Sequence, residues 1–429
     1  MRFPFLVIGL FGSSVAFANP LTLSDVYELA RANDPALSEQ LAIRDAAAAR
    51  ENQTRAGRGF SIDASATAQA SENLVTDNTS ETGTLSVTFS LPLYNRELNA
   101  SIRSQRASAR GADATLAAYR QTHLVSVAEA YFDVLSAEQD LAAAKAEVTA
   151  FERQLEQAEE RLSVGIGTRV DVDQARARLD LAQVSVISSE VALETAQSAL
   201  SELIDQPVMA LADLSGDFEA TVHRSMQNEI DAWVQAHPSV VAKQEALGSA
   251  YASLDQARAE TTPSVALSSQ FSMSDTSGSA TASANGTSRS NVVSMTLSAP
   301  LFTNGARDAG VAVAMAGVEQ AQADLLATER AVKSGIVLAH RALEASARTV
   351  EARQLAIVSA ASRLEATEAA YAVGAGDIVE VLNAEKDLIA AERDFAKARH
   401  AHAVRQLEFD QAIGDLSETA IERINDTLQ

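Results

Sequence analysis

The sequence predicts a mainly α-helical protein with two structural repeats, each joining a β-hairpin to a long helical hairpin. Three observations lead to this prediction: the placement of the eight prolines, an internal duplication and sustained heptad patterns. No proline lies between 93 and 206 or after 300. Stretches of this length without a helix breaker, rich in Ala, Leu, Glu, Gln and Arg, are typical of very long helices.

The composition excludes several classes of protein. The 429 residues carry 34 basic and 57 acidic side chains, a formal net charge of −23, whereas a nucleic-acid-binding surface needs a basic face. Cysteine is absent, which removes disulfides, thiolate ligands and cysteine nucleophiles. The chain contains no phosphate-binding loop, nucleophile elbow or metal-ligand motif. The sequence therefore predicts no enzymatic activity, no cofactor and no metal site.

The first 18 residues have the pattern of a secretory signal peptide. Arg2 precedes a short apolar run, and Ala16-Phe17-Ala18 matches a cleavage site. Because no later segment offers ~20 uninterrupted apolar residues, we expect any insertion into a membrane to use strands.

An internal duplication divides the mature chain. Pro35 is equivalent to Pro238, and Val164 to Val373, at a nearly constant separation. Each repeat is expected to contain a first helix (23–58 or 240–260), a β-hairpin, a long helix, a tip turn and a returning helix. The expected domains are a signal peptide (1–18), a first repeat (19–204), a linker (205–237), a second repeat (238–415) and a C-terminal tail (416–429).

Period-two alternation of apolar and polar residues predicts the two hairpins, over 61–92 and 264–300. The segments between the strands, 71–84 and 272–291, are rich in Ser, Thr, Gly and Asn and are expected to be loops. The strands are then about nine to eleven residues long, enough to cross a bilayer when tilted.

Heptad spacing predicts that two long helices in each repeat pack as an antiparallel coiled coil. Large and small apolar residues alternate along 134–162 and 172–203, and again along 343–371 and 381–395. The glycine-containing tip turns are expected at 165–168 and 374–377.

Four strands cannot close a barrel, and open sheet edges are not tolerated in lipid. We therefore expect copies of the chain to share one barrel. Two copies give eight strands, and side chains fill the lumen of a barrel of that size. Three copies give twelve strands, which leave room for a pore.

Two tip segments and two proline segments are specific enough to compare with known families. They are 164–176 (VGIGTRVDVDQAR), 371–384 (YAVGAGDIVEVLNA), 91–94 (LPLY) and 299–302 (APLF). Over essentially the whole mature chain, these segments and the duplication resemble the TolC family of outer-membrane efflux and secretion channels. The resemblance implies a homotrimer in the outer membrane of a Gram-negative cell. It also implies a shared 12-stranded β-barrel, a periplasmic α-helical tunnel and an equatorial belt that includes 205–237.

The resemblance also implies partners and a function. The expected function is a passive exit duct for multidrug efflux or type I protein secretion. The expected partners are a periplasmic adaptor, an inner-membrane pump (an ABC or a proton-driven transporter) and outer-membrane lipid, without nucleic acid. The alternative from another class is an exported structural coiled coil or adhesin without a pore, which the strands of membrane-crossing length disfavour.

Particular residues follow from the resemblance. Tyr371 and Asp171 match members of the family's closed gate, whereas Gly376 occupies the position of its arginine, so that Arg169 is the candidate replacement. In the family, two rings of acidic residues form the pore constriction. Their positions correspond to Glu380 and Asn383 of this sequence, so only the ring at Glu380 keeps a charge. A ring of like charges selects for cations.

Two further sets of residues are assigned in the same way. The adaptor is expected to contact the tips at Val164, Gly165, Val373 and Gly374, and Pro92 and Pro300 match the turns from strand to helix. Independently of the resemblance, His400 and His402 are not expected to bind a metal together, since a spacing of two places them on different sides of a helix. They are expected to be solvated surface residues, as is usual for unclustered histidines.

Overall fold

The computed structural model describes residues 20–73, 78–215, 218, 220, 229–278 and 285–428. The predicted signal peptide, 1–18, lies outside the described residues. The helices are α1 (Leu23–Asn33), α2 (Pro35–Ala56), α3 (Arg96–Ser163), α4 (Arg169–Ile204), α5 (Ile230–Ala236), α6 (Pro238–Ala259), α7 (Ala306–Ala372), α8 (Ile378–Ala412) and α9 (Glu418–Asn425). The strands are β1 (Ser61–Asn73), β2 (Asn78–Tyr94), β3 (Ser264–Ser277) and β4 (Gly286–Ser298). In these ranges no helix has both the length and the apolar character of a membrane span.

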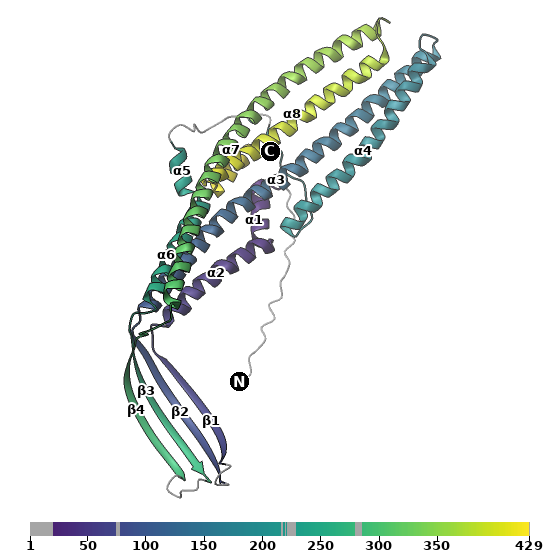
Figure 1. Cartoon of the computed structure of the whole chain (residues 1–429). Helices are drawn as coiled ribbons and strands as arrows, with labels where there is room; N and C mark the ends of the chain where they lie inside the picture. The colour runs from purple at the N-terminus through teal and green to yellow at the C-terminus, as the bar shows by residue number, and fades with distance from the viewer. Residues whose placement is uncertain are drawn as a thin grey trace. The chain divides into compact units, whose positions relative to one another are not determined.

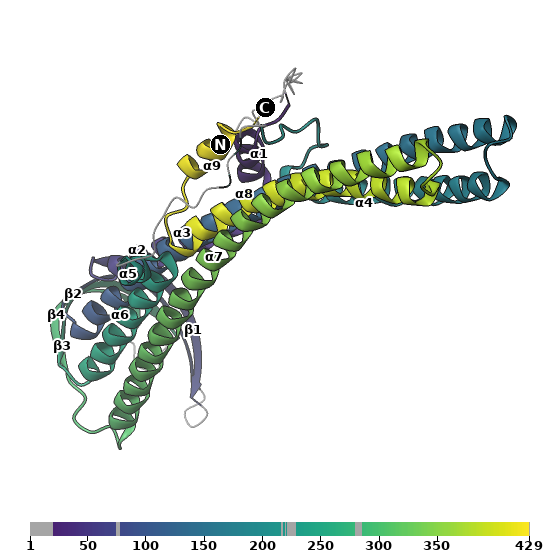
Figure 2. The ribbon, with the colours of Figure 1, turned by 90° about the horizontal axis from the view of Figure 1, so that it is seen from above.

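The predicted fold class is confirmed: the chain is mainly helical, with two repeats and one antiparallel sheet (Figure 1). The chain divides into two compact units, and the divisions fall inside α2, α3, α5 and α7. We call them the tip unit (described residues of Met1–Leu37, Arg120–Ile230 and Ser334–Gln429) and the sheet unit (Ser38–Tyr119 and Asp231–Lys333). In the tip unit, α3 runs beside α4 and α7 beside α8 toward the two tip turns (Figure 2).

The first helix of repeat one is interrupted, which the sequence prediction missed. α1 ends at Asn33 and α2 begins at Pro35, with Asp34 in an extended conformation (φ −68°, ψ 116°). Proline disfavours helical geometry at the preceding residue, so the break falls at Asp34. The Asp34 carboxylate then accepts a hydrogen bond from the backbone N–H of Ala36 (2.8 Å) and lies 2.9 Å from Nε2 of His123.

The four strands form one antiparallel sheet in the order β1-β2-β3-β4. The strands are longer than predicted, at 13, 17, 14 and 13 residues, and most of the two expected loops is paired as strand. The many serines and threonines of these segments predict loops, but threonine suits strands well and any residue except proline supplies both backbone groups to a ladder. Pro92 lies in β2 opposite Ala266, next to a register irregularity, and Pro300 lies between the end of β4 and the start of α7.

The sheet has two different faces. One is largely apolar, and its members near the helices are well exposed in a single chain, such as Ile62 (63%), Met295 (69%) and Leu297 (69%). The other face is mostly hydroxyl-bearing, and paired serines meet on it across neighbouring strands. These pairs are Ser65–Ser86, Ser268–Ser294, Ser272–Ser290 and Ser274–Ser288. An antiparallel sheet of this kind suits a wall between an apolar and an aqueous phase.

Two apolar clusters hold the tip unit together. The larger combines α1, α3, α4, α8 and α9, and in it the Tyr131 hydroxyl donates to the carbonyls of Leu21 and Ala212. The smaller lies near the tips and draws residues from all four long helices, among them Phe151, Val172, Tyr371 and Leu382. The small seam residues Ala158, Ala175 and Ala182 are buried, as the heptad pattern predicts.

Candidate functional site at the tips of the helical hairpins

The two tip turns have the same backbone structure. Gly165 (φ +80°) and Gly374 (φ +78°) both take the left-handed conformation that terminates a helix. In each turn the two following N–H groups donate to one carbonyl, that of Arg161 (3.0 and 2.9 Å) or that of Ala370 (2.9 and 3.1 Å). The duplication thus extends to the detail of the turns.

Gly376 lies in the second tip turn, where the packing of the backbone leaves little room for a side chain. A Cβ at this position would lie 3.1 Å from the backbone nitrogen of Tyr371, and the equivalent Cβ at Gly167 would lie 2.8 Å from that of Leu162. A side chain at 376 therefore fits only if the turn shifts by a few tenths of an ångström. The arginine that the resemblance places here is replaced by a residue that suits a tight turn.

The residues after each turn cap the returning helix. Thr168 Oγ1 accepts from the N–H of Asp171 (3.2 Å), and the Asp171 carboxylate accepts from the N–H of Thr168 (3.0 Å). This capping box occupies the Asp171 carboxylate at the start of α4, where the helix dipole also favours a negative charge. Asp377 caps α8 in a similar way through the N–H of Val379 (3.1 Å).

Tyr371 is buried and is covered by a cation from the other repeat. The Arg161 guanidinium carbon lies 4.5 Å from the centre of the Tyr371 ring, within the range of a cation–π interaction. Burial raises the pKa of Tyr371; Arg161 opposes this, and the charges of Asp171 and Asp377 add to it. The candidate replacement cation, Arg169, is instead 87% exposed and lies 3.8 Å from Asp173.

The two constriction candidates lie on the first turns of α8 with different surroundings. Glu380 is exposed, whereas Asn383 is half-buried. Nη2 of Arg178 on α4 donates to Oδ1 of Asn383 (3.4 Å), a second link between the repeats. The predicted adaptor-contact residues Val164 and Val373 are 65% and 80% exposed, beside the exposed Ile166 (70%).

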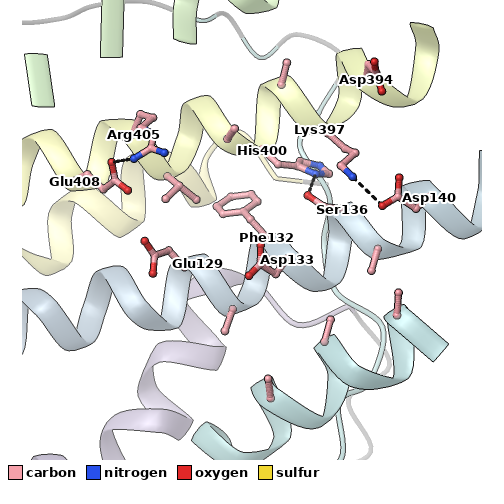
Figure 3. A pocket seen from close by; sticks show the side chains of 18 of the residues that line it. Glu129, Phe132, Asp133, Ser136, Asp140, Asp394, Lys397, His400, Arg405 and Glu408 are labelled. Atoms are coloured by element: carbon pink, nitrogen blue, oxygen red, sulfur yellow. Dashed lines mark hydrogen bonds and ion pairs between the residues drawn. The ribbon is translucent and has the colours of Figure 1, made fainter. Parts of the chain in front are cut away.

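A groove of about 1240 Å³ lies farther from the tips, between α3, α4, α7 and α8 (Figure 3). Across it, Nζ of Lys397 donates to Oδ2 of Asp140 (2.7 Å), and Ser136 Oγ lies 3.2 Å from Nδ1 of His400. Both contacts join the first repeat to the second. The two helical hairpins are therefore linked at the groove and again near the tips.

The prediction for the histidines was wrong. His400 and His402 are 2% and 0% exposed. Nε2 of His400 lies 2.7 Å from Oδ1 of Asp213, and Nδ1 of His402 lies 2.8 Å from Oγ of Ser346. Burial acts to raise the pKa of Asp213, but the hydrogen bond and charge of His400, with further help from Arg399, hold it below its ordinary value. Residues two apart do face different sides of α8, but each of these sides packs against another element.

Comparison with protein families identifies the architecture. The family model described as outer membrane efflux protein matches residues 26–205 and 230–415, one match for each repeat. The chain belongs to this family.

Relatives of the chain include an outer membrane protein and a protease secretion protein. The chain is 30% identical over 421 residues to outer membrane protein TolC of Vibrio cholerae, covering 97% of this chain and 95% of that protein. It is 26% identical over 428 residues to the alkaline protease secretion protein AprF of Pseudomonas aeruginosa, covering 95% and 87%. The solved structure of CusC has the same fold, with a TM-score of 0.81 at 20% identity and 92% coverage of both chains.

Two arginines near the tips make contacts that the sequence does not predict. Arg161 and Arg178 link the repeats of this family member, but they stand among many arginines on long helices and match no motif. The heptad phase places Leu162 and Leu179 in the seams, so it gives each arginine a position beside a seam. It does not say which residue of the other repeat lies opposite.

Proposed function

We propose that the protein is the outer-membrane exit duct of a tripartite export system, for multidrug efflux or type I protein secretion. In this proposal three copies share a 12-stranded β-barrel and continue into the periplasm as a helical tunnel. A periplasmic adaptor and an inner-membrane pump open the tunnel at its tips. Membership of the family and the export proteins among its relatives support this function.

The observation that carries the proposal is the two-faced sheet. Its apolar face fits lipid and its hydroxyl face fits an aqueous lumen. A barrel has no edges, whereas β1 and β4 are the edges of this four-stranded sheet. Three copies provide twelve strands, which is enough for a lumen that side chains do not fill.

The proposed gate lies at the tips. Tyr371 with Arg161 and Asn383 with Arg178 hold the two hairpins together, and Asp171 and Arg169 lie at the same end of the tunnel. Glu380, exposed on the first turn of α8, is the proposed charged ring of the constriction. The adaptor is proposed to contact the exposed apolar turns at Val164–Gly165 and Val373–Gly374.

The proposal is tested with the purified protein in planar bilayers. We expect a conducting, cation-selective channel whose selectivity falls in Glu380→Gln, because the ring of carboxylates attracts cations. Glu392→Gln is the matched control, since Glu392 is also exposed on α8 but lies away from the tip. A protein that never conducts contradicts the proposed duct. Equal selectivity in both variants contradicts the role of Glu380.

A further inference from the structure

The groove between α3, α4, α7 and α8 combines an apolar lining with charged side chains (Figure 3). Small side chains from three helices, among them Ala130, Ala196 and Ala401, form much of the apolar part, with Val404 beside them. The volume of about 1240 Å³ is above the range of about 300–1,000 Å³ that is usual for small-molecule sites, so the groove has room for a polycyclic ligand.

The basic side chains of the lining are already paired. Each lysine and arginine that lines the groove has an acidic partner there. The pairs are Lys397–Asp140 (2.7 Å), Arg353–Asp394 (3.0 Å) and Arg405–Glu408. An anionic ligand would therefore have to displace a carboxylate from one of these pairs, which disfavours anions.

Two carboxylates of the lining have no such partner. Glu129 and Asp133 are exposed on α3, and within the part of the chain that the structure describes neither takes part in an ion pair. Residues four apart on a helix are neighbours, so both carboxylates can reach one ligand. Glu129 projects toward Arg405 and Glu408 of α8 (Figure 3). Burial and the charges of Glu408 and Asp133 raise the pKa of Glu129, and Arg405 opposes this, so a positive ligand would relieve the repulsion.

The lining suits an organic cation better than a metal ion. Among the described residues, no group of three or more His, Asp or Glu side chains is placed to hold a metal. Alanine and valine offer nothing to a hydrated ion, whereas the apolar body of an organic ligand leaves water when it lies against them. We propose that the groove binds a flat aromatic cation, with its charge beside Glu129 and Asp133 and its rings on the alanine lining.

The groove lies on the side of α3 that faces away from the equatorial belt. Asp133 and Ala137 line it, whereas Tyr131 on the opposite side of the helix donates to the carbonyls of Leu21 and Ala212. In the proposed duct the belt runs around the outside of the tunnel, so the groove opens to the lumen and an exported cation would pass it. Only this placement rests on the proposed function, since binding requires the groove of one chain alone.

Fluorescence anisotropy of ethidium, a flat aromatic cation, tests the site. The purified protein in lipid nanodiscs is titrated, with empty nanodiscs as the blank. We expect saturable binding that Glu129→Gln/Asp133→Asn weakens roughly 10-fold, because two favourable charge contacts near water are removed. Ala401→Phe should weaken binding without a change of charge, since Ala401 is exposed in the groove and a larger side chain there takes the place of the rings.

The matched control is Glu152→Gln/Glu156→Gln. These carboxylates are also exposed and four residues apart on α3, but they lie outside the groove, so this variant should bind ethidium as the wild type does. An equal loss in both double variants would mean that the overall negative charge of the protein attracts ethidium, and would overturn the site.

Other results also overturn the site. Equally tight binding of the anionic dye anilinonaphthalene sulfonate, lost in Ala401→Phe, means that the carboxylates select nothing. Displacement of ethidium by Mg²⁺, where Na⁺ of equal ionic strength has no effect, means that the carboxylates hold a metal. A protein that conducts but does not bind ethidium overturns the site and leaves the duct standing. A protein that binds ethidium but never conducts supports the site and overturns the duct.

Discussion

Leu382 provides a quantitative test of the packing near the tips. The side chain is 1% exposed and lies in the cluster that joins all four long helices. Truncation to alanine removes buried methyl groups and leaves a cavity, at a cost of about 2–5 kcal/mol. Since both hairpins contribute to this cluster, most of that cost weakens the contact between them.

Limited proteolysis measures the effect at the tips. When opening is fast relative to cleavage, the cleavage rate follows the population of the open state. A loss of about 3 kcal/mol raises that population by roughly 100-fold, since each 1.4 kcal/mol is about tenfold. We therefore expect Leu382→Ala to be cut near Gly165 and Gly374 about two orders of magnitude faster than the wild type.

Leu162→Ala is the matched control. The residue type is the same and it is also near a tip, but the side chain is 39% exposed, so the cost is smaller. If Leu382→Ala is cut no faster than Leu162→Ala, the four long helices do not share a core there and the reasoning fails.

Two further predictions concern contacts between distant segments of the chain. Arg161→Gln should raise the open fraction in planar bilayers by about 2- to 30-fold, the equivalent of a cation–π interaction of about 0.5–2 kcal/mol. Tyr371→Phe keeps the ring under Arg161 and should act less, and the opposite order would contradict the contact. Asp213 ionises more easily in the folded protein, so its contribution is complete above its ordinary pKa of 3.8 and is lost as the pH falls below that value. Asp213→Asn should therefore lose less thermal stability than the wild type between about pH 6 and pH 3, and parallel curves would contradict the role of the Asp213–His400 pair.

The sequence predicts this architecture well because its signals are local or periodic. Gly165 and Gly374 mark turns that need a positive φ, and the buried alanines at 158, 175 and 182 follow the heptads. The long stretches without proline mark the long helices. None of these features depends on which residue of a distant segment lies opposite.

The errors have identifiable physical causes. The prediction of one helix over 23–58 is wrong at Asp34, because Pro35 disfavours helical geometry at the residue before it. The strands extend into the serine-rich segments because these segments pair with a neighbouring strand, as Ser274 does with Ser288. The composition of one segment does not indicate this pairing. His400 and His402 are buried by α3, α7 and the segment around Asp213, which no pattern within α8 could indicate.

The assignment of residues to a gate stays a prediction, but the structure gives the contacts that these residues make within one chain. Tyr371 contacts Arg161 on the long helix of the other repeat, whereas Arg169 beside the turn lies near Asp173. Asp171 caps α4. Which side chains meet across two helices depends on the register of one hairpin against the other, and a single sequence does not contain that register.

The mass of the particle extracted from the outer membrane tests the central claim most directly. Native mass spectrometry of the wild-type protein in detergent should give three mature chains, because a single chain supplies four strands and leaves two sheet edges open. A membrane-inserted particle with the mass of one chain would contradict the shared barrel and the duct that depends on it.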